Sequence, residues 1–105
     1  MISKDKSKAA RIPAAKLEQV AATLRLLAHP MRLRVVEALD ALGEAPVHAL
    51  TARVGMAPAA LSQHLNQMKR AGLVRSARRG REVWYSVADP RALTVLACIR
   101  GRGGR

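Results

Sequence analysis

This 105-residue sequence predicts a mainly α-helical fold that carries one β-hairpin, on the strength of three patterns. In the central stretch, Ala57 to Val74, apolar residues recur at helical spacing on one face: Leu61, Leu65 and Met68. A shorter apolar helix, Val47 to Val54, precedes it across a turn of about three residues that begins at Gly55. Two alternating runs around a glycine-containing turn follow it. Together these patterns predict a winged helix-turn-helix of about five helices.

The segment before the first helix is polar, mostly cationic and without periodicity, so we expect residues 1–12 to form a mobile basic arm. Pro13 then opens a helix whose apolar residues keep the helical period: Leu17, Val20, Ala21, Leu24, Leu27 and Ala28. This stripe is larger than a domain of this size must bury. We therefore expect part of it to form a subunit interface.

The second helix is predicted to begin at Pro30, because proline is tolerated at a first helical position, and to end at Gly43. Four of its residues form the expected buried face: Leu33, Val36, Leu39 and Leu42. Arg32 and Arg34 point elsewhere, and we expect them to be solvated or close to backbone phosphates. Residues 44–46 are expected to connect this helix to the helix-turn-helix.

The runs Leu73 to Ala77 and Glu82 to Val87 alternate apolar and polar residues, which predicts two strands joined at Arg79-Gly80-Arg81. Three arginines are expected at the tip of this hairpin: Arg78, Arg79 and Arg81. Such charges can bind nucleic acid, but exposed charges also protect edge strands from pairing with other chains, and that alternative stays open. Trp84 and Tyr85 are neighbours in a strand, so one should be buried and the other partly exposed.

The last helix is predicted to have Asp89 as its cap and Pro90 at its first position, and to continue to about Arg100. It is apolar on more than one side: Leu93, Leu96, Ala97 and Ile99. We therefore expect a dimer joined through the first and last helices. The residues assigned to its interface are Leu17, Val20, Leu24, Leu93 and Leu96. Residues 101–105 are expected to be a disordered basic tail, which leaves residues 13–100 as one domain.

Lysine and arginine number 19 against 7 aspartate and glutamate residues, a formal charge of +12 that makes nucleic acid the expected partner. A genome biased toward arginine is the alternative, since fourteen of these cations are arginine. Position argues against it, because six cations and no acid lie between Lys69 and Arg81. The single cysteine, Cys98, excludes an intrachain disulfide and fits a reducing cytoplasm. No apolar run approaches the roughly 20 residues that span a bilayer, so we expect a cytoplasmic protein without a membrane partner.

The polar face of the central helix and the hairpin carry the residues expected to bind double-stranded DNA: Ser62, Gln63, His64, Asn66, Gln67, Lys69, Arg70, Arg75, Arg78, Arg79 and Arg81. Gln63 can present a donor and an acceptor together to adenine in the major groove. The cations would bind phosphates and supply the sequence-independent part of the affinity. His64 borders the buried face, so it either contacts DNA or packs against the core.

Two other classes of function fit less well. An enzyme would need a glycine-rich phosphate loop, a metal-ligand cluster or a nucleophile-base pair, and the sequence shows none, so we expect no enzymatic activity and no cofactor. RNA-binding modules usually stack bases on several aromatics, and this chain offers Trp84 and Tyr85 alone. A non-specific or architectural nucleic-acid-binding protein stays as the alternative, which a sequence-selective footprint on duplex DNA would exclude.

Four segments, in their order and spacing, resemble the ArsR/SmtB family of bacterial winged-helix repressors: LLAHPMRLRVVEAL, ALSQHL, AGLV and RRGREVWYSVADP. The resemblance covers about Ala15 to Arg100. It implies a homodimer joined through its first and last helices, with reading helices in successive major grooves and wings toward the minor groove. It also implies repression of an operator that is relieved by an inducer, which the sequence does not identify.

The metal positions of the family hold other residues in this chain. The arsenic-type thiolate pair falls on Pro46 and His48. The positions of the zinc-type ligands are Asp89, Arg91, Arg102 and Arg105. Three cations in place of ligands would repel a divalent ion, so we expect no metal site.

The thiol-based sensors of the same family pair a cysteine in the second helix with one in the last helix. The second-helix position is Glu37 here, which leaves Cys98 alone. Free cysteine packs well among apolar neighbours, so we expect Cys98 to be a buried small hydrophobe. A redox role, including an interchain disulfide, is the alternative.

Overall fold

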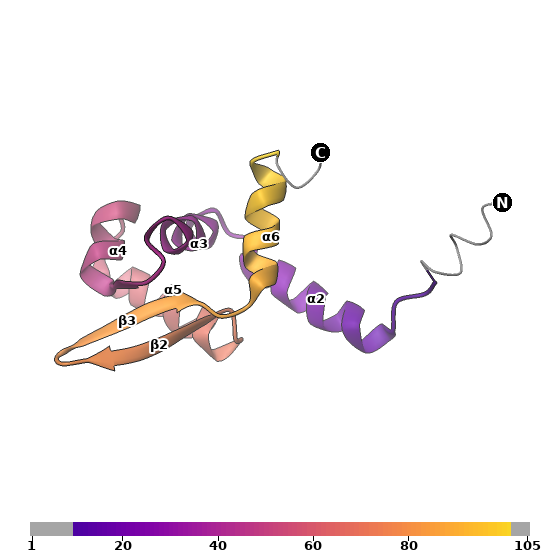
Figure 1. Cartoon of the computed structure of the whole chain (residues 1–105), viewed down its shortest axis with the longest axis horizontal. Helices are drawn as coiled ribbons and strands as arrows, with labels where there is room; N and C mark the ends of the chain where they lie inside the picture. The colour runs from indigo at the N-terminus through magenta and orange to yellow at the C-terminus, as the bar shows by residue number, and fades with distance from the viewer. Residues whose placement is uncertain (1–9, 102–105) are drawn as a thin grey trace.

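Five helices and a small sheet make up the structure, a computed structural model that describes residues 10–101 (Figure 1). In chain order the elements are α2 (Ala14–Leu27), α3 (Pro30–Leu42), β1 (Ala45–Pro46), α4 (Val47–Val54), α5 (Pro58–Arg70), β2 (Val74–Arg79), β3 (Glu82–Val87) and α6 (Pro90–Ile99). The predicted mainly helical fold with one hairpin is confirmed. Of the predicted arm, residues 1–9 lie outside the described part of the chain, and residues 10–12 form neither helix nor strand. Of the predicted tail, residues 102–105 lie outside it.

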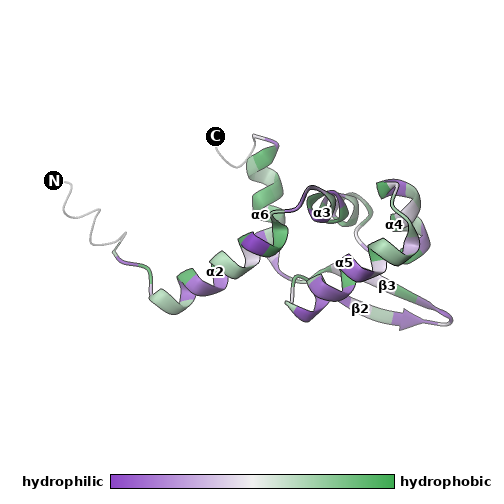
Figure 2. Ribbon diagram, turned by 180° about the vertical axis from the view of Figure 1, so that it is seen from behind, coloured by the Kyte–Doolittle hydropathy of each residue, from purple (hydrophilic) through white to green (hydrophobic). Residues whose placement is uncertain are grey.

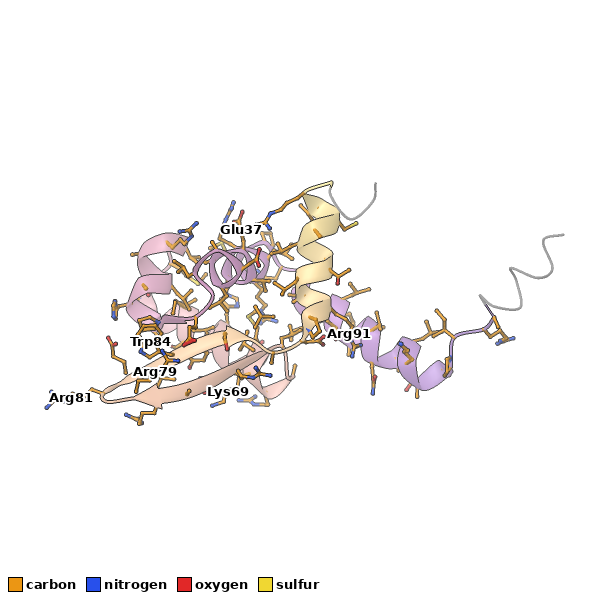
Figure 3. All side chains as sticks on the ribbon, viewed as in Figure 1. Glu37, Lys69, Arg79, Arg81, Trp84 and Arg91 are labelled. Carbon is orange, nitrogen blue, oxygen red and sulfur yellow. The ribbon has the colours of Figure 1, made fainter. Side chains whose placement is uncertain are left out.

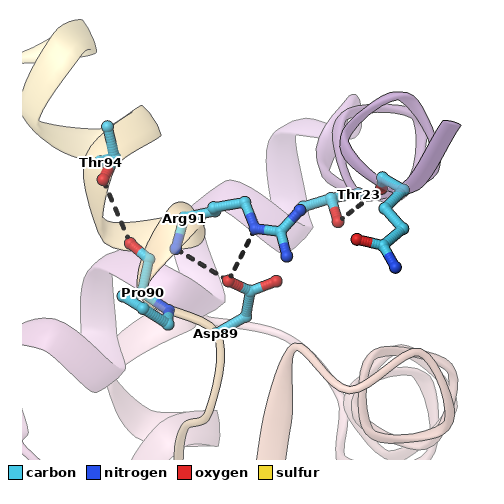
Figure 4. A network of polar contacts seen from close by, with 6 residues as sticks. Thr23, Asp89, Pro90, Arg91 and Thr94 are labelled. Atoms are coloured by element: carbon cyan, nitrogen blue, oxygen red, sulfur yellow. Dashed lines mark hydrogen bonds and ion pairs between the residues drawn. The ribbon is translucent and has the colours of Figure 1, made fainter. Parts of the chain in front are cut away.

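Side-chain caps begin α3 and α6. His29 Nδ1 accepts a hydrogen bond from the backbone N–H of Met31 at 3.2 Å, and Pro30 occupies the first position of α3. The carboxylate of Asp89 accepts from the backbone N–H of Arg91 at 2.9 Å and pairs with Nε of the same residue at 3.3 Å (Figure 4). The cap predicted for the last helix is therefore confirmed.

The turn of the helix-turn-helix spans residues 55–57, as predicted. Gly55 ends α4 in the left-handed conformation with φ 78°, which a residue without Cβ adopts at little cost. Ala57 stands at the cap of α5 and offers no side chain to hydrogen bond, while Pro58 occupies the first helical position. Proline there has no N–H that would be left unpaired, which partly offsets the missing cap.

The core lies where α3, α4, α5 and the sheet meet. Three residues of α5 are fully buried there, as predicted: Leu61, Leu65 and Met68. From α6, Ala92 and Leu96 join the same core. Leu96 was assigned to a subunit interface, but its side chain is 5 % exposed within the single chain. It therefore has almost no surface left to offer a partner, and that assignment was wrong.

The buried face of α3 differs from the prediction. Val36 and Leu39 are buried as expected, but Val35 and Ala38 are buried with them. Leu42, predicted to be buried, is 41 % exposed. The reason is that α3 packs against α4 on one side and against α6 on another, which widens its buried face and turns it away from Leu42. Apolar spacing along one helix does not reveal a second packing partner.

The sheet has three antiparallel strands in the order β1, β3, β2. Arg79 pairs with Glu82, so the turn of the hairpin consists of Gly80 and Arg81 alone. The prediction ended the first strand at Ala77 and placed Arg79 in the turn. It was wrong because strand pairing continues for two residues after the apolar alternation has stopped.

The short strand β1 was not predicted, since residues 44–46 were expected to be a plain connector. Ala45 pairs with Tyr85 and Pro46 pairs with Trp84. Two residues are too few to show an alternating pattern. Tyr85 is buried and Trp84 is half-buried, so the predicted division between these aromatics is confirmed.

The first helix, α2, runs outward from the body formed by the other helices and the hairpin (Figure 1). Leu27 is the buried residue of α2, whereas Leu17 is 51 % exposed and Leu24 is 49 % exposed. An apolar stripe on a projecting helix is therefore left uncovered within the single chain. None of the helices among residues 10–101 combines the length and the apolar character that crossing a membrane requires.

Candidate nucleic-acid interface

The helix α5 has one buried face and one open face. Gln63, Asn66 and Arg70 are three and four residues apart along the chain, so they form one exposed stripe opposite the buried leucines. Within the described residues, the side-chain hydrogen bonds of α5 are made by His64 and Gln67. The open stripe thus keeps its donors and acceptors available for a partner.

Cations surround this stripe on α5 and on the hairpin. Six of them are exposed: Lys69, Arg70, Arg75, Arg78, Arg79 and Arg81. Figure 3 shows Lys69 and Arg81 along one side of the molecule and Glu37 on the opposite side, above α3. Figure 2 shows hydrophilic residues along α5 and at the end of the hairpin, whereas α6 is mostly hydrophobic. Six exposed cations therefore accompany the polar stripe, on α5 itself and on the hairpin.

Two residues predicted to contact DNA accept hydrogen bonds from Arg32 within the protein. His64 Nδ1 accepts a hydrogen bond from Nε of Arg32 at 3.0 Å, and Gln67 Oε1 accepts another from Nη2 of the same guanidinium. The ring of His29 meets that of His64 edge to face, with centroids 4.7 Å apart. For His64 the structure supports packing, the second of the two alternatives that its sequence position left open. Gln67 is still exposed, and one lone pair of its Oε1 is occupied by this bond.

Arg32 itself was expected to be solvated or close to phosphates, and this prediction was wrong. Its Nη1 donates to the carbonyl oxygen of Leu26 at 3.2 Å, in addition to the two bonds to α5. Arg34, by contrast, is exposed as expected and pairs with Glu37 one turn along α3. The periodicity of a helix cannot tell two such arginines apart, because the acceptors of Arg32 lie on other helices.

The environment of His64 disfavours its charged form. Partial burial lowers the pKa of its imidazole below the ordinary value of 6.5, and the neighbouring Arg32 and His29 lower it further. Because Nδ1 accepts from Arg32, the neutral ring carries its proton on Nε2. Near neutral pH this histidine is an uncharged acceptor on the flank of α5.

Arg79 does not belong to a group of free cations at the hairpin tip. Its guanidinium pairs with the carboxylate of Glu44 and lies over the ring of Trp84, 4.7 Å from the centroid (Figure 3). Arg79 does lie at the hairpin tip as predicted, but this pairing was not foreseen, because both partners lie next to strand β1. On the hairpin, Arg75, Arg78 and Arg81 remain exposed without a described side-chain partner.

The metal-ligand positions of the family are engaged in other contacts. His48 Nε2 lies 2.7 Å from Oε2 of Glu82, Pro46 is buried in β1, and Arg91 pairs with Asp89. The remaining zinc-type positions, Arg102 and Arg105, lie outside the described residues. Among the residues that are described, no three histidine, cysteine, aspartate or glutamate side chains are placed to hold a metal ion.

Cys98 is exposed, so its predicted burial was wrong. It lies next to Ile99, which is 61 % exposed, near the end of α6. Apolar neighbours in the chain do not ensure that another element covers a residue.

Comparison with known proteins shows which family the chain belongs to. The helix-turn-helix domain family matches residues 27–77, from the end of α2 into β2. YgaV, an HTH-type transcriptional regulator of Escherichia coli K12, is 31 % identical over 86 residues, which cover 82 % of this chain and 87 % of that protein.

Two solved structures share the fold at similar identity. The crystal structure of AntR, an antimony-specific transcriptional repressor, matches with a TM-score of 0.78 and 31 % identity over 91 % of this chain and 90 % of that chain. The homodimeric winged helix-turn-helix DNA-binding domain Mb0332 of Mycobacterium bovis matches with a TM-score of 0.71 and 33 % identity over 83 % and 80 %. The expected resemblance is thereby confirmed, and the chain belongs to the ArsR/SmtB family of winged helix-turn-helix transcriptional regulators.

Proposed function

We propose that this chain is a homodimeric repressor that binds a palindromic operator in double-stranded DNA. Each protomer places α5 in a major groove, where Gln63 and Asn66 contact base edges. The remaining contacts go to phosphates and come from Ser62, Lys69, Arg70, Arg75, Arg78 and Arg81. Three residues are left out of the interface because they form hydrogen bonds or ion pairs within the protein: His64, Gln67 and Arg79.

The observation that carries the proposal is the open stripe of α5. An amide pair, Gln63 and Asn66, is exposed on a helix whose other face is fully buried, and both side chains are free of partners within the described residues. Amide side chains suit adenine because they present a donor and an acceptor side by side. Five further exposed cations on α5 and the hairpin supply the attraction for phosphate.

The dimer in this proposal is joined through α2 and α6. Leu17, Leu24 and Ile99 are large apolar residues that are about half exposed or more in the single chain. Burying such side chains between two copies would remove the apolar stripe of α2 from water. Each Å² of apolar surface buried in this way stabilises the dimer by roughly 25 cal/mol. The similar domain Mb0332 is a homodimer and the similar protein AntR is a repressor, which supports both parts of the proposal.

In this function the chain binds DNA and catalyses no reaction, and it acts in the cytoplasm, where its DNA partner lies. The proposed interface is polar and cationic, and its side chains suit the base edges and phosphates of DNA. We assign none of them to a catalytic step.

Selection of duplexes from a randomised library, followed by footprinting and light scattering, tests this function. We expect a motif with two-fold symmetry, half-sites about one helical turn or roughly 34 Å apart, and one dimer for each operator. Uniform protection of any duplex, with no enriched motif, would instead indicate a non-specific architectural protein. A monomer that binds the selected duplex tightly would contradict the proposed architecture.

A further inference from the structure

One guanidinium, that of Arg32, connects three helices. It belongs to α3 and donates to the Leu26 carbonyl in the last turn of α2 at 3.2 Å. It also donates to His64 at 3.0 Å and to Gln67, both on α5. Arginine can do this because its donors are held in a rigid planar fork. The end of α2 and the flank of α5 are thus fixed relative to the same group.

Few other contacts set the direction in which α2 leaves the body. Within residues 10–101, the bond from Arg32 to Leu26 is the only side-chain hydrogen bond or ion pair between α2 and another element. Leu27 is the only residue of α2 that is buried. Leu26 is half-buried against the same core, so these two leucines at the end of α2 and the bond from Arg32 hold the helix to the body. A helix held at one end in this way is able to tilt if the arginine is lost.

We propose that Arg32 is a positioning residue that sets the distance between the two reading helices of the dimer, and therefore the half-site spacing that the protein accepts. The inference rests on the proposed function, in which α2 joins the protomers and α5 reads DNA. A tilt of α2 relative to α5 is repeated by the two-fold axis, so it alters the separation of the reading helices in both protomers. Arg32 acts through His64, Gln67 and Leu26 without touching DNA.

Operators that differ only in spacing test this role. The probes are the duplex selected by the wild-type chain and two derivatives with one base pair added or removed between the half-sites. One base pair displaces a half-site by about 3.4 Å and rotates it by about 36°. We expect the wild-type chain to lose about tenfold or more in affinity on both derivatives, and we define the ratio of native to altered affinity as the spacing ratio.

Arg32→Ala and Arg32→Lys are expected to lower the spacing ratio by at least about fivefold. Lysine keeps the positive charge but lacks the fork that joins three acceptors, so it separates geometry from charge. Arg34→Ala is the matched control, because it removes an arginine two residues away that is paired with Glu37 and makes no described hydrogen bond or ion pair with α5. Its spacing ratio should equal that of the wild-type chain.

His64→Leu removes an acceptor from α5 and leaves α3 unchanged. It therefore tests the positioning role of Arg32 if Arg32→Ala fails to fold. It should also lower the spacing ratio. A folded variant that loses affinity equally on all spacings would overturn the proposal and reduce Arg32 to a general stabilising contact. Failure of the wild-type chain to select any two-fold motif would be a different result, since it would refute the proposed function itself.

Discussion

Removing Arg81 should weaken the salt dependence of DNA binding, whereas removing Arg79 should leave it almost unchanged. Arg81 is exposed in the hairpin turn and has no described side-chain partner. Arg79 is two residues away, but its guanidinium pairs with Glu44 and covers Trp84. A cation that is already paired releases few counterions from DNA. Two arginines of equal charge that are two residues apart are therefore expected to behave differently.

The size of the effect follows from counterion release. Each phosphate contact contributes about 0.9 to the slope of log K against log salt concentration on B-form DNA. The dimer carries two copies of Arg81, so Arg81→Ala should make the slope shallower by about 1.8. Arg79→Ala should change the slope by well under about one unit, because only long-range charge is lost.

Fluorescence anisotropy with a labelled duplex measures both slopes, between about 50 and about 300 mM salt. The selected operator and an unrelated duplex of the same length should show the same reduction for Arg81→Ala, since phosphate contacts carry no sequence information. Arg34→Ala removes a cation from the side of α3 that bears Glu37 and serves as the matched control. It should behave like the wild-type chain.

Equal slopes for Arg81→Ala and the wild-type chain would refute the reasoning, because the hairpin turn would then not reach the phosphate backbone. A reduction for Arg79→Ala as large as that for Arg81→Ala would refute it in another way. It would mean that DNA displaces Glu44 and recruits Arg79 on binding.

Three further predictions concern the reading helix, the pH dependence and the dimer. Gln63→Ala should cost about 1 to 3 kcal/mol on the selected operator and little on unrelated DNA, as measured by competition binding; equal losses on both would remove Gln63 from base recognition. The depressed pKa of His64 means that the unfolded chain binds this proton more readily than the folded chain, so the free energy of unfolding should fall as the pH drops below about 6.5. In urea titrations at several pH values His64→Gln should lack that component, and an unchanged pH dependence would contradict the assignment. Leu24→Glu should yield folded monomers in light scattering while Leu42→Glu, at a similarly exposed leucine of α3, stays dimeric; a dimeric Leu24→Glu chain would move the interface away from α2.

Local chemistry in the sequence was enough to predict the helices and the turn between α4 and α5. Glycine at residue 55 ends one helix because it adopts the left-handed conformation easily. Proline at residue 58 begins the next because its fixed φ suits the first helical position. The buried stripe of α5 follows from helical spacing alone. The Asp89 cap and the division between Trp84 and Tyr85 depend on neighbouring residues in the same way.

The candidate interface was predictable only in part. The exposed stripe with Gln63 and Asn66 follows from its place opposite the buried face of a single helix. The roles of His64, Gln67 and Arg79 do not, because each depends on a partner more than thirty residues away in the chain. A polar side chain on a helix or strand has the same pattern in the sequence whether it faces solvent, DNA or another helix.

What the sequence determined by itself is the order of the helices and the hairpin, the ends of the helices and the side of α5 that is open, since these depend on backbone preferences and short-range periodicity. Tertiary structure alone decided that β1 pairs with β3, that Leu42 and Cys98 stay exposed, and that Arg32 connects α2 with α5. The physical reason is the geometry of hydrogen bonds and packing between distant segments. A guanidinium or a two-residue strand forms hydrogen bonds with the groups that the fold places within about 3 Å of it. The residues next to it in the sequence do not indicate which groups these are.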